Sequence, residues 1–272
     1  MVTKFDALNA ERINDALKQF SKENLQTPYT GQVSCFETID STNAWLLVNG
    51  KDGDICLSET QTAGRGRRDN SWVSPQSGNI YLSFCCYIDS TVQHRSLLSL
   101  VAGIATAEAL QENGLTGHGL KWPNDIFWQD KKLGGILIQT AENYQKFIIG
   151  IGLNVRLPDD SRSEITQAAV SLEEALHGKT FDRETVVITL LQRLLLHSEM
   201  FSELPFQAFS QSWQRWDILH GREVSFQHQD QHITGKVEGI DQQGRMGIRL
   251  DSTSNIAYYS AADIKLKKPS QH

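Results

Sequence analysis

The spacing of hydrophobic residues predicts helices and strands that alternate along most of the chain. Residues 9–20 carry apolar side chains at helical spacing behind a candidate cap at Asn9. The same spacing predicts further helices at residues 94–113, 168–177, 182–202 and 208–216. Asp182 is a candidate cap for one of them, and another helix is expected to begin after Ser41.

Runs rich in β-branched and aromatic residues predict the strands between these helices. They lie at residues 33–39, 54–59, 79–88, 126–128, 133–140 and 147–155. The last three runs are closely spaced and are expected in the middle of a sheet. After Gly221 the pattern changes to short alternating strands, at residues 223–228, 233–240 and 247–250. We therefore expect an α/β fold of the α+β type, with a mixed central sheet flanked by helices and a small C-terminal β-barrel.

The change of pattern near Leu219 predicts how the chain is divided. We expect an N-terminal helix and lead-in at residues 1–30, a large domain at 31–218 and the barrel at 219–272. No internal repeat or low-complexity segment is visible.

Charge and hydropathy restrict the classes of partner. The net charge is −6, which argues against nucleic acid as the main partner. The most apolar run, residues 97–107, is too short to span a bilayer, and no charged segment followed by an apolar one opens the chain. We therefore expect a cytoplasmic protein that binds neither nucleic acid nor a membrane.

The cysteines and histidines are not spaced as metal ligands. The chain has 4 cysteines without a CxxC motif, and the adjacent Cys85 and Cys86 should point to opposite faces of a strand. His228 and His232 are four residues apart, but their surroundings predict a strand, where this spacing does not make a zinc site. A metal held in a cage of protein ligands is not expected.

The segment Gln61-Thr62-Ala63-Gly64-Arg65-Gly66-Arg67-Arg68 carries the strongest chemical signal. It places three guanidinium groups on a loop whose glycines permit close backbone approach. Guanidinium groups match the oxygens of carboxylates and phosphates, so the loop suggests an anion pocket. A solvated basic turn and a nucleic-acid patch are the alternatives when the loop is taken alone.

Other segments combine glycine or proline with polar side chains. Residues 121–125 place Lys121 before a rigid Trp-Pro step, and Lys132 begins a strand that contains two glycines. Residues 150–155 repeat the glycine pattern before Asn154, and residues 40–43 supply short polar side chains at a helix start. Each segment alone is more often a turn or a cap, but their combination suggests one site.

These motifs resemble those of biotin protein ligases, in the same order along the chain. The matching segments are IDSTN at 39–43, GRGRR at 64–68, KWPND at 121–125, KLGGIL at 132–137 and GIGLNV at 150–155. The resemblance extends from about residue 30 to the end and is to the monofunctional type, the biotin–[acetyl-CoA-carboxylase] ligases. It implies a catalytic domain similar to class II aminoacyl-tRNA synthetases and an SH3-like barrel.

The resemblance also implies a reaction in two steps. Biotin and ATP first form biotinoyl-5′-AMP with release of pyrophosphate, and a lysine of a biotin carboxyl carrier protein then takes the acyl group while AMP leaves. An anionic carboxylate must approach an anionic triphosphate, so fixed positive charge and Mg²⁺ should lower the barrier. Arg67, Lys121 and Lys132 are the expected catalytic cations.

The remaining site residues follow from the same resemblance. Biotin is expected to contact Ser41, Thr42, Asn43, Gln61, Arg65, Gly66, Arg67 and Lys132. The nucleotide is expected to contact Arg67, Arg68, Trp72, Lys121, Asn124 and Asn154. Asp125 either holds Mg²⁺ through water or only orients Lys121, and residues 62–75 should close over the intermediate.

Several alternatives stay open at this stage. A lipoate or octanoyl ligase or transferase of related fold is the close rival, and a biotin-sensing module without turnover is the rival of another class. Asp69 stands where the family often has glycine, and Lys267 of the barrel is a candidate ATP contact. Residues 1–30 are fewer than the roughly 60 that a winged helix needs, so DNA binding is not expected. The chain is a monomer or a homodimer.

Overall fold

The structure is a computed structural model of the 272-residue chain. It describes residues 7–68, 70–76, 78–88, 95–141, 145–163, 165, 167–204, 206–228, 231–260 and 264–266.

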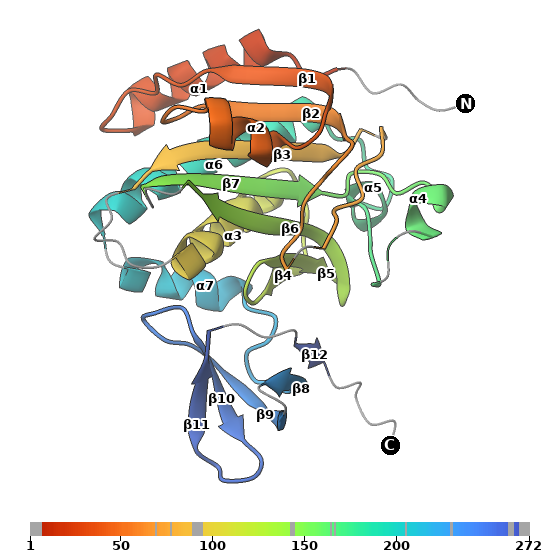
Figure 1. Ribbon diagram of the computed structural model, residues 1–272, viewed down its shortest axis with the longest axis vertical. Coiled ribbons are helices and arrows are strands. Elements are labelled where there is room, and N and C mark those ends of the chain that lie inside the picture. Colours follow the sequence, from red (N-terminus) through yellow and green to blue (C-terminus); the bar gives the residue numbers. More distant parts are fainter. Residues whose placement is uncertain are drawn as a thin grey trace.

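A mixed seven-stranded sheet forms the body of the molecule (Figure 1). Its strands are β1 Val33–Ile39, β2 Ile55–Gln61, β3 Ile80–Tyr87, β4 His118–Lys121, β5 Asp125–Trp128, β6 Lys131–Thr140 and β7 Lys146–Leu153. Their order in the sheet is β1-β2-β3-β7-β6-β5-β4, with β1 and β2 parallel and the other neighbours antiparallel. This pairing places β3 beside β7, which is distant from it in sequence, at the centre of the sheet.

Helices cover the two faces of this sheet unequally. The larger helices are α1 Ala10–Asn24, α3 Arg95–Glu112 and α6 Arg183–Glu203, which pack behind the sheet in Figure 1. The short helix α2 Thr42–Asn49 lies on the opposite face, over β2, β3 and β7. The remaining helical elements are α4 Asp159–Ser163, α5 Leu172–Ala175, η1 Phe206–Phe209 and α7 Ser210–Trp216. Among the described residues, no helix is both long and apolar enough to cross a bilayer.

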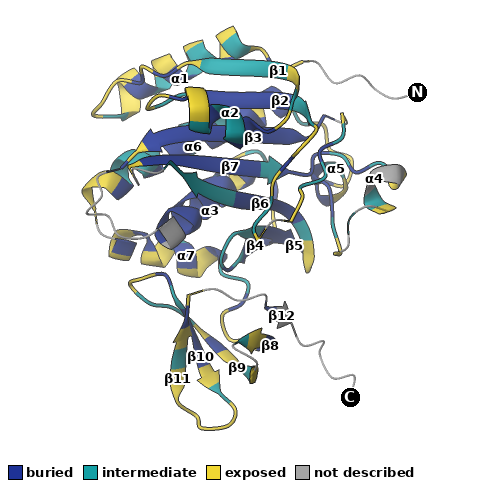
Figure 2. Cartoon of the chain, in the orientation of Figure 1, coloured by how far each residue is buried: buried dark blue, intermediate teal, exposed yellow. Residues whose placement is uncertain are grey.

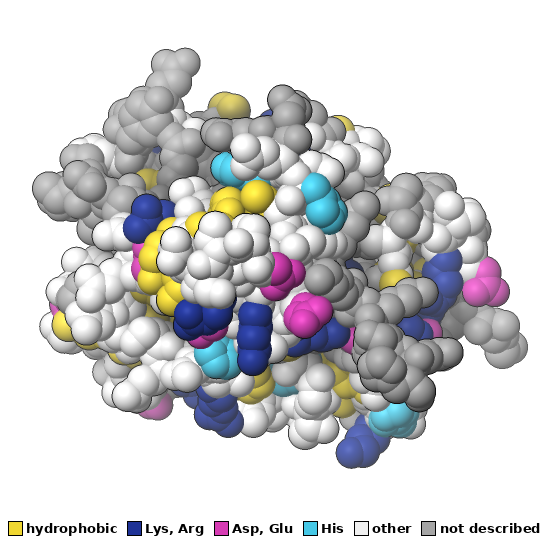
Figure 3. Space-filling model, turned by 90° about the horizontal axis from the view of Figure 1, so that it is seen from below, with side chains coloured by type: hydrophobic (Ala, Val, Ile, Leu, Met, Phe, Trp, Pro, Cys, Tyr) yellow, Lys and Arg dark blue, Asp and Glu magenta, His cyan; other side chains and the backbone are white. Residues whose placement is uncertain are grey.

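A second, antiparallel sheet of five strands follows α7. Its strands are β8 Glu223–His228, β9 Gln231–Ile240, β10 Met246–Leu250, β11 Ile256–Tyr259 and β12 Lys265–Leu266. Figure 3 views this end of the molecule and shows basic and acidic side chains close together. The segment that connects α7 to β8 is attached to the first sheet, because the amide of Ile218 donates to the carbonyl of Leu120 in β4 at 3.1 Å. The boundary near Leu219 stays a prediction.

The hydrophobic core agrees with the sequence pattern. Figure 2 shows the central strands buried and the outer faces of α1 and α7 largely exposed. Cys85 packs in the small cluster under α2, whereas Cys86 packs in the main core, so the adjacent cysteines point to opposite faces as predicted. Asn9, Ser41 and Asp182 each accept a backbone N–H at a helix start, which confirms the predicted caps Asn9 and Asp182 and the predicted helix start after Ser41.

The predicted helix at residues 168–177 is wrong in extent. Only α5, residues 172–175, is helical within it, and the preceding residues run extended beside β6. The amide of Lys132 donates to the carbonyl of Ala168 at 2.9 Å, and the amide of Val170 donates to the carbonyl of Lys132 at 3.0 Å. These bonds to β6 replace the bonds that a helix would make. The short strands β4, β11 and β12 were not predicted.

Candidate functional site

A cavity of about 440 Å³ opens on the face of the sheet that carries α2. It is bounded by the start of α2, by strands β3, β6 and β7, and by the extended segment before α5. Residues 62–68 and 70–75, the arginine-rich loop, form the remaining side. The lining residues are Ser41, Thr42, Asn43, Gln61, Arg65, Gly66, Arg67, Arg68, Asn70, Ser71, Trp72, Val73, Tyr81, Leu82, Asn124, Asp125, Lys132, Gly135, Ile136, Leu137, Gly150, Ile151, Gly152, Asn154, Ile165, Gln167 and Ala169. Segments that span more than a hundred residues of sequence therefore meet in one hollow, as the motif combination predicted.

Short polar side chains form a hydrogen-bonded row at the α2 end of the cavity. Thr42 donates to the Gln61 side-chain oxygen from its backbone N–H, at 2.9 Å, and its hydroxyl lies 3.1 Å from the same oxygen. The Ser83 hydroxyl lies 2.7 Å from the Thr42 hydroxyl and 2.5 Å from the Asn43 side-chain oxygen. Asn43 donates in turn to Gln139 at 2.9 Å. Because buried polar groups are costly when unpaired, this row fixes the side chains in one arrangement.

Ser83 and Gln139 were missed by the sequence interpretation. Each lies inside a strand whose residues read as ordinary sheet formers, and neither belongs to a motif. Their role depends on the pairing of β3, β7 and β6, which brings them next to α2. Tyr81, Gln167 and Ala169 were missed for the same reason, since no local pattern places them at the cavity.

Two glycines of β7 make room for the parts that cover the sheet. A Cβ atom on Gly150 would lie 2.2 Å from the Asn43 side-chain oxygen, and one on Gly152 would lie 2.6 Å from the Trp72 ring. Both residues point to the same face because they are two apart in a strand. The room that these glycines leave is occupied by the side chains of Asn43 and Trp72, and the expectation that it serves a ligand stays a prediction.

The arginine-rich loop folds back on itself over the cavity. Trp72 donates its amide to the carbonyl of Gly64 at 2.9 Å, and Gly66 donates to the carbonyl of Asn70 at 2.6 Å. Arg68 adopts a positive φ of 54° at the turn. The Trp72 ring lies on Gly152, and its buried indole N–H has no hydrogen-bond partner among the residues that the structure describes.

Two of the predicted cations reach the cavity from different walls. Arg67 of the loop donates to the Asn124 side-chain oxygen at 2.8 Å. Lys132 of β6 forms an ion pair with Asp125 at 2.8 Å, and its ammonium lies 5.4 Å from the centroid of the Trp72 ring. The adjacent residues Asn124 and Asp125 thus hold one cation each. Asp125 forms its ion pair with Lys132, a partner that the sequence did not predict for it. Its two expected roles, holding Mg²⁺ through water or orienting Lys121, stay predictions.

Lys121 is not brought to the cavity. It ends β4, lies outside the lining residues, and places its ammonium 4.9 Å from the centroid of the Phe127 ring. The prediction that Lys121 shares one hollow with Arg67 and Lys132 is therefore not met by this structure. Lys121 and Asp125 lie directly opposite each other and share a face of the sheet, but β4 is the edge strand and the Lys121 side chain extends toward Phe127. Asp69 and Lys267 lie outside the described residues.

Three residues of the KWPND motif, Trp122, Pro123 and Asn124, each bond to a different element of the protein. Buried Trp122 donates its indole N–H to the carbonyl of Gly244, in the turn between β9 and β10, at 2.9 Å. The carbonyl of Pro123, which follows a cis peptide bond, accepts from Ser99 of α3 at 3.1 Å. Asn124 donates to the carbonyl of Ile136 in β6 at 2.9 Å. The motif therefore links the second sheet to the cavity.

Asn154 lies at the opposite wall, after the end of β7. Its side chain is buried and lies 3.4 Å from the carbonyls of Lys132 and Val170. The extended segment that includes Ala169 runs beside Lys132, so Asn154 holds this segment against β6. Among the described residues no group of three or more His, Cys, Asp or Glu is arranged to hold a metal, and Asp125 is the single acidic residue in the described lining.

Comparisons with known proteins agree on one family. The Biotin/lipoate A/B protein ligase family matches residues 35–155. The chain is 35% identical over 227 residues to the bifunctional ligase/repressor BirA of Escherichia coli (strain K12), covering 81% of this chain and 70% of the relative. It is 31% identical over 234 residues to the biotin–[acetyl-CoA-carboxylase] ligase of Mycobacterium tuberculosis (strain ATCC 25618 / H37Rv), covering 82% of this chain and 85% of the relative.

A solved structure extends this similarity to three dimensions. The biotin protein ligase from Aquifex aeolicus in complex with biotin and ATP matches with a TM-score of 0.75 and 31% identity. The match covers 87% of this chain and 98% of that chain.

Proposed function

The chain belongs to the biotin protein ligase family, and from this premise we propose that its cavity is where biotin and ATP are joined and where the product is held for transfer. The protein is a ligase that uses biotin and ATP through a biotinyl-AMP intermediate. The observation that carries the site assignment is the convergence of Arg67 and Lys132 on one cavity that also contains the polar row of α2.

The polar row supplies what an uncharged bicyclic head group requires. Ser41, Thr42 and Gln61 present hydroxyl and amide groups at the α2 end of the cavity, and a ureido ring both donates and accepts hydrogen bonds. Asn43 already bonds to Ser83 and Gln139, so its contribution is to hold the wall in place. We therefore propose that the ring of biotin lies at α2, with its valeryl chain directed toward Arg67 and Lys132.

The two cations act where negative charge is brought together. The biotin carboxylate must approach the α-phosphorus of ATP, a bond from that oxygen to phosphorus forms, and pyrophosphate leaves. Preorganised cations at this point lower the electrostatic cost of bringing the two anions together and stabilise the charge of the transition state. Asn124 and Asp125 orient Arg67 and Lys132 for this purpose.

Mg²⁺ fits the site as a partner of the nucleotide. This ion is usually held by one or two carboxylates together with substrate phosphates, and it neutralises phosphate charge. Asp125 is the described lining carboxylate that could face it, through water, while keeping its contact with Lys132.

The folded loop protects the intermediate from water. An acyl-adenylate hydrolyses readily, so a cover is needed between the two steps. The loop closes on itself through the Gly64 and Trp72 backbone bond and rests on Gly152. Opening of this loop would admit the second substrate, a lysine of a biotin carboxyl carrier protein, whose amine attacks the acyl carbon while AMP leaves.

The partner and assembly are part of the proposal. We expect the acceptor to be a carrier domain of a biotin-dependent carboxylase, and no nucleic acid to be required. The choice between monomer and homodimer, and the cytoplasmic location, stay predictions from the sequence.

Mass spectrometry of a purified carrier domain tests the function directly. The domain is incubated with the protein, MgATP and either biotin or lipoate. A gain of one biotinyl group that disappears when the acceptor lysine is changed to arginine supports the proposal. A gain with lipoate alone would assign the chain to the lipoate branch of its family, and no gain with either acid would contradict transfer to such domains.

A further inference from the structure

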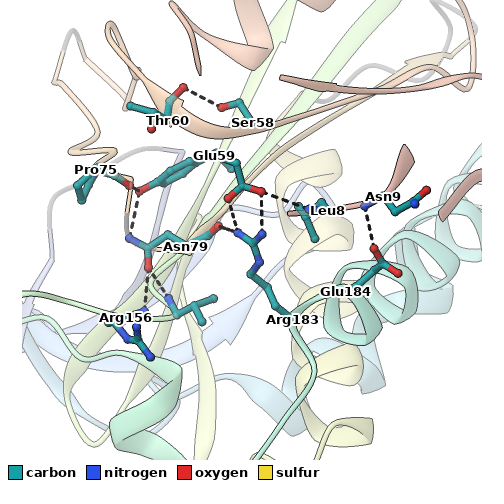
Figure 4. A network of polar contacts seen from close by, with 12 residues as sticks. Leu8, Asn9, Ser58, Glu59, Thr60, Pro75, Asn79, Arg156, Arg183 and Glu184 are labelled. Atoms are coloured by element: carbon teal, nitrogen blue, oxygen red, sulfur yellow. Dashed lines mark hydrogen bonds and ion pairs between the residues drawn. The ribbon is translucent and has the colours of Figure 1, made fainter. Parts of the chain in front are cut away.

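The side chain of Asn79 connects two walls of the cavity. Asn79 precedes β3 and is only 1% exposed. Its side-chain oxygen accepts the backbone N–H groups of Val155 and Arg156, each at 2.8 Å. Its amide nitrogen donates to the phenol oxygen of Tyr81 at 3.0 Å, and that phenol donates to the carbonyl of Pro75 at 3.0 Å (Figure 4).

Each end of this chain of bonds belongs to a different part of the site. Val155 follows Asn154, which lines the cavity and holds the segment beside Lys132. Pro75 lies at the C-terminal end of the arginine-rich loop, directly after Ser74, which bonds to Gln61 at 3.1 Å. The ring of Tyr81 lines the cavity between them. One amide therefore links the loop end to the strand end.

The backbone of Asn79 is itself fixed from behind the sheet. Arg183, the first residue of α6, is 4% exposed and forms two bonds of 2.7 Å with the carboxylate of Glu59. The same guanidinium donates to the carbonyl of Asn79 at 3.3 Å. Glu59 also accepts the amide of Leu8 at 3.3 Å, so the segment before α1 joins this network. A buried, doubly bonded ion pair gives the amide a rigid support.

We propose that Asn79 and Tyr81 are positioning residues that hold the end of the arginine-rich loop at a fixed place relative to the Asn154 end of β7, and so keep biotinyl-AMP enclosed. This inference rests on the proposed function for its consequence, but its structural part does not. The chemistry requires an amide at residue 79, because the group must accept two N–H groups and also donate to a phenol. An aspartate would accept from all three, so the Tyr81 hydroxyl would turn toward it and release Pro75.

Two substitutions separate the arms of the connection. Tyr81→Phe keeps the ring that lines the cavity and removes the bond to Pro75, whereas Asn79→Asp keeps the acceptor for Val155 and Arg156. Tyr29→Phe is the matched control, because Tyr29 is also buried but its hydroxyl has no hydrogen-bond partner among the described residues, and it lies in the lead-in away from the cavity.

The readouts are the release rate of biotinyl-AMP and amide hydrogen exchange. Both variants are expected to release biotinyl-AMP about three- to tenfold faster than the wild type, the effect of one ordinary hydrogen bond. Amide hydrogen exchange should be faster at the loop amides, including that of Trp72, and unchanged at the amides of Val155 and Arg156. Tyr29→Phe should match the wild type in both measurements.

The inference would be overturned if Tyr81→Phe, Tyr29→Phe and the wild type released biotinyl-AMP at the same rate and showed the same amide hydrogen exchange in the loop. A wild type without biotin-dependent exchange of pyrophosphate would instead refute the proposed function, and amide exchange would still test the connection. If both variants lost stability, the loss of exchange protection would spread over the whole chain, and uniform loss without a preference for the loop would also count against a positioning role.

Discussion

Arg67 and Lys132 enter the cavity from a loop and a strand, and neighbouring residues of one motif orient them. Arg67 bonds to an amide and Lys132 to a carboxylate, at 2.8 Å in each case. The Asn124 side chain also bonds to the carbonyl of Ile136, and Asp125 is held in β5 by pairing with both neighbouring strands, so both partners of the cations are anchored. Preorganised charge of this kind acts without reorganisation during the reaction.

Removing the guanidinium should open the site. In Arg67→Ala the loop loses its bond to Asn124, so biotinyl-AMP is expected to escape at least about tenfold faster, since bonds to charged groups contribute more than ordinary ones. The release rate is measured with labelled biotin by rapid filtration. Arg193→Ala, which removes an ion-paired arginine of α6, is the charge-matched control. Equal release by the two variants would contradict the role of Arg67.

The cysteines of β1, β2 and β3 are expected to be unreactive. Burial raises the pKa of the Cys56 and Cys85 thiols to about 12 and that of Cys35 to about 11. A pKa of 12 rather than 9 reduces the thiolate at pH 8 on the order of a thousandfold. Because folding raises the pKa of the Cys56 thiol, the contribution of this buried, protonated thiol to the free energy of unfolding is fully present below pH 9. That contribution is lost as the pH rises toward 12. Ellman's reagent should label the unfolded chain quickly and the native chain slowly; rapid native labelling of Cys56 or Cys85 would contradict this burial.

At the scale of elements, β7 supports two parts of the protein that pack on it, α2 and the arginine-rich loop. Its residues alternate between the helices behind the sheet and the cavity in front, and small residues occupy the front positions at Gly150 and Gly152. The α2 side chain of Asn43 sits over the first and the loop side chain of Trp72 over the second. Different positions of β7 therefore support the α2 end of the cavity, through Gly150, and the arginine-rich loop, through Gly152.

Adding one methyl group at each glycine should separate these roles. Gly150→Ala pushes on Asn43 and is expected to raise the KM for biotin about tenfold or more, with a smaller effect on the KM for ATP. Gly152→Ala pushes on the Trp72 ring and is expected mainly to accelerate release of biotinyl-AMP. The two variants are compared by steady-state kinetics and release assays, with thermal unfolding as the control for stability. If the two variants changed the KM values and the release rate of biotinyl-AMP in the same way, α2 and the arginine-rich loop would not act independently.

The motifs revealed the site better than the periodicity revealed its boundaries. Hydrophobic spacing located most helices and strands because their buried faces are continuous, as in α6 and β3. It failed at residues 168–171, where bonds to Lys132 override local preference, and in short β4. Motif order gave Arg67, Lys132, Asn124 and the α2 residues. It could not show that Lys121 turns toward Phe127, because sequence spacing does not report the direction of a side chain at the end of a hairpin.

At the scale of the whole molecule, the second sheet touches the reactive site through one turn. The carbonyl of Gly244 accepts the indole N–H of Trp122, two residues before Asn124. Asp241 braces this turn by accepting the amides of Gln243 and Arg245. A displacement of the second sheet would therefore be transmitted to the residue that holds Arg67. This contact gives the C-terminal sheet a supporting function that needs no direct contact with ATP.

A matched pair of glycine substitutions tests that coupling. Gly244 and Gly114 have φ values of 70° and 87°, but a Cβ on Gly244 would lie 2.7 Å from Leu97 whereas Gly114 has open space around it. Both alanine variants should lose roughly 1–2 kcal/mol from backbone strain. Only Gly244→Ala is expected to raise the KM for ATP, by about threefold or more, because it alone displaces the turn from Trp122. A normal KM for ATP in a folded Gly244→Ala protein would contradict the coupling.

The central claim is that one cavity brings a carboxylate and a triphosphate into reaction, and biotin-dependent exchange of labelled pyrophosphate into ATP measures this step without any carrier protein. We predict exchange that requires biotin, is not supported by lipoate, and falls at least about a hundredfold when Arg67 and Lys132 are both changed to alanine. Exchange that persists in the double variant, or that is absent from the wild type, would contradict the account.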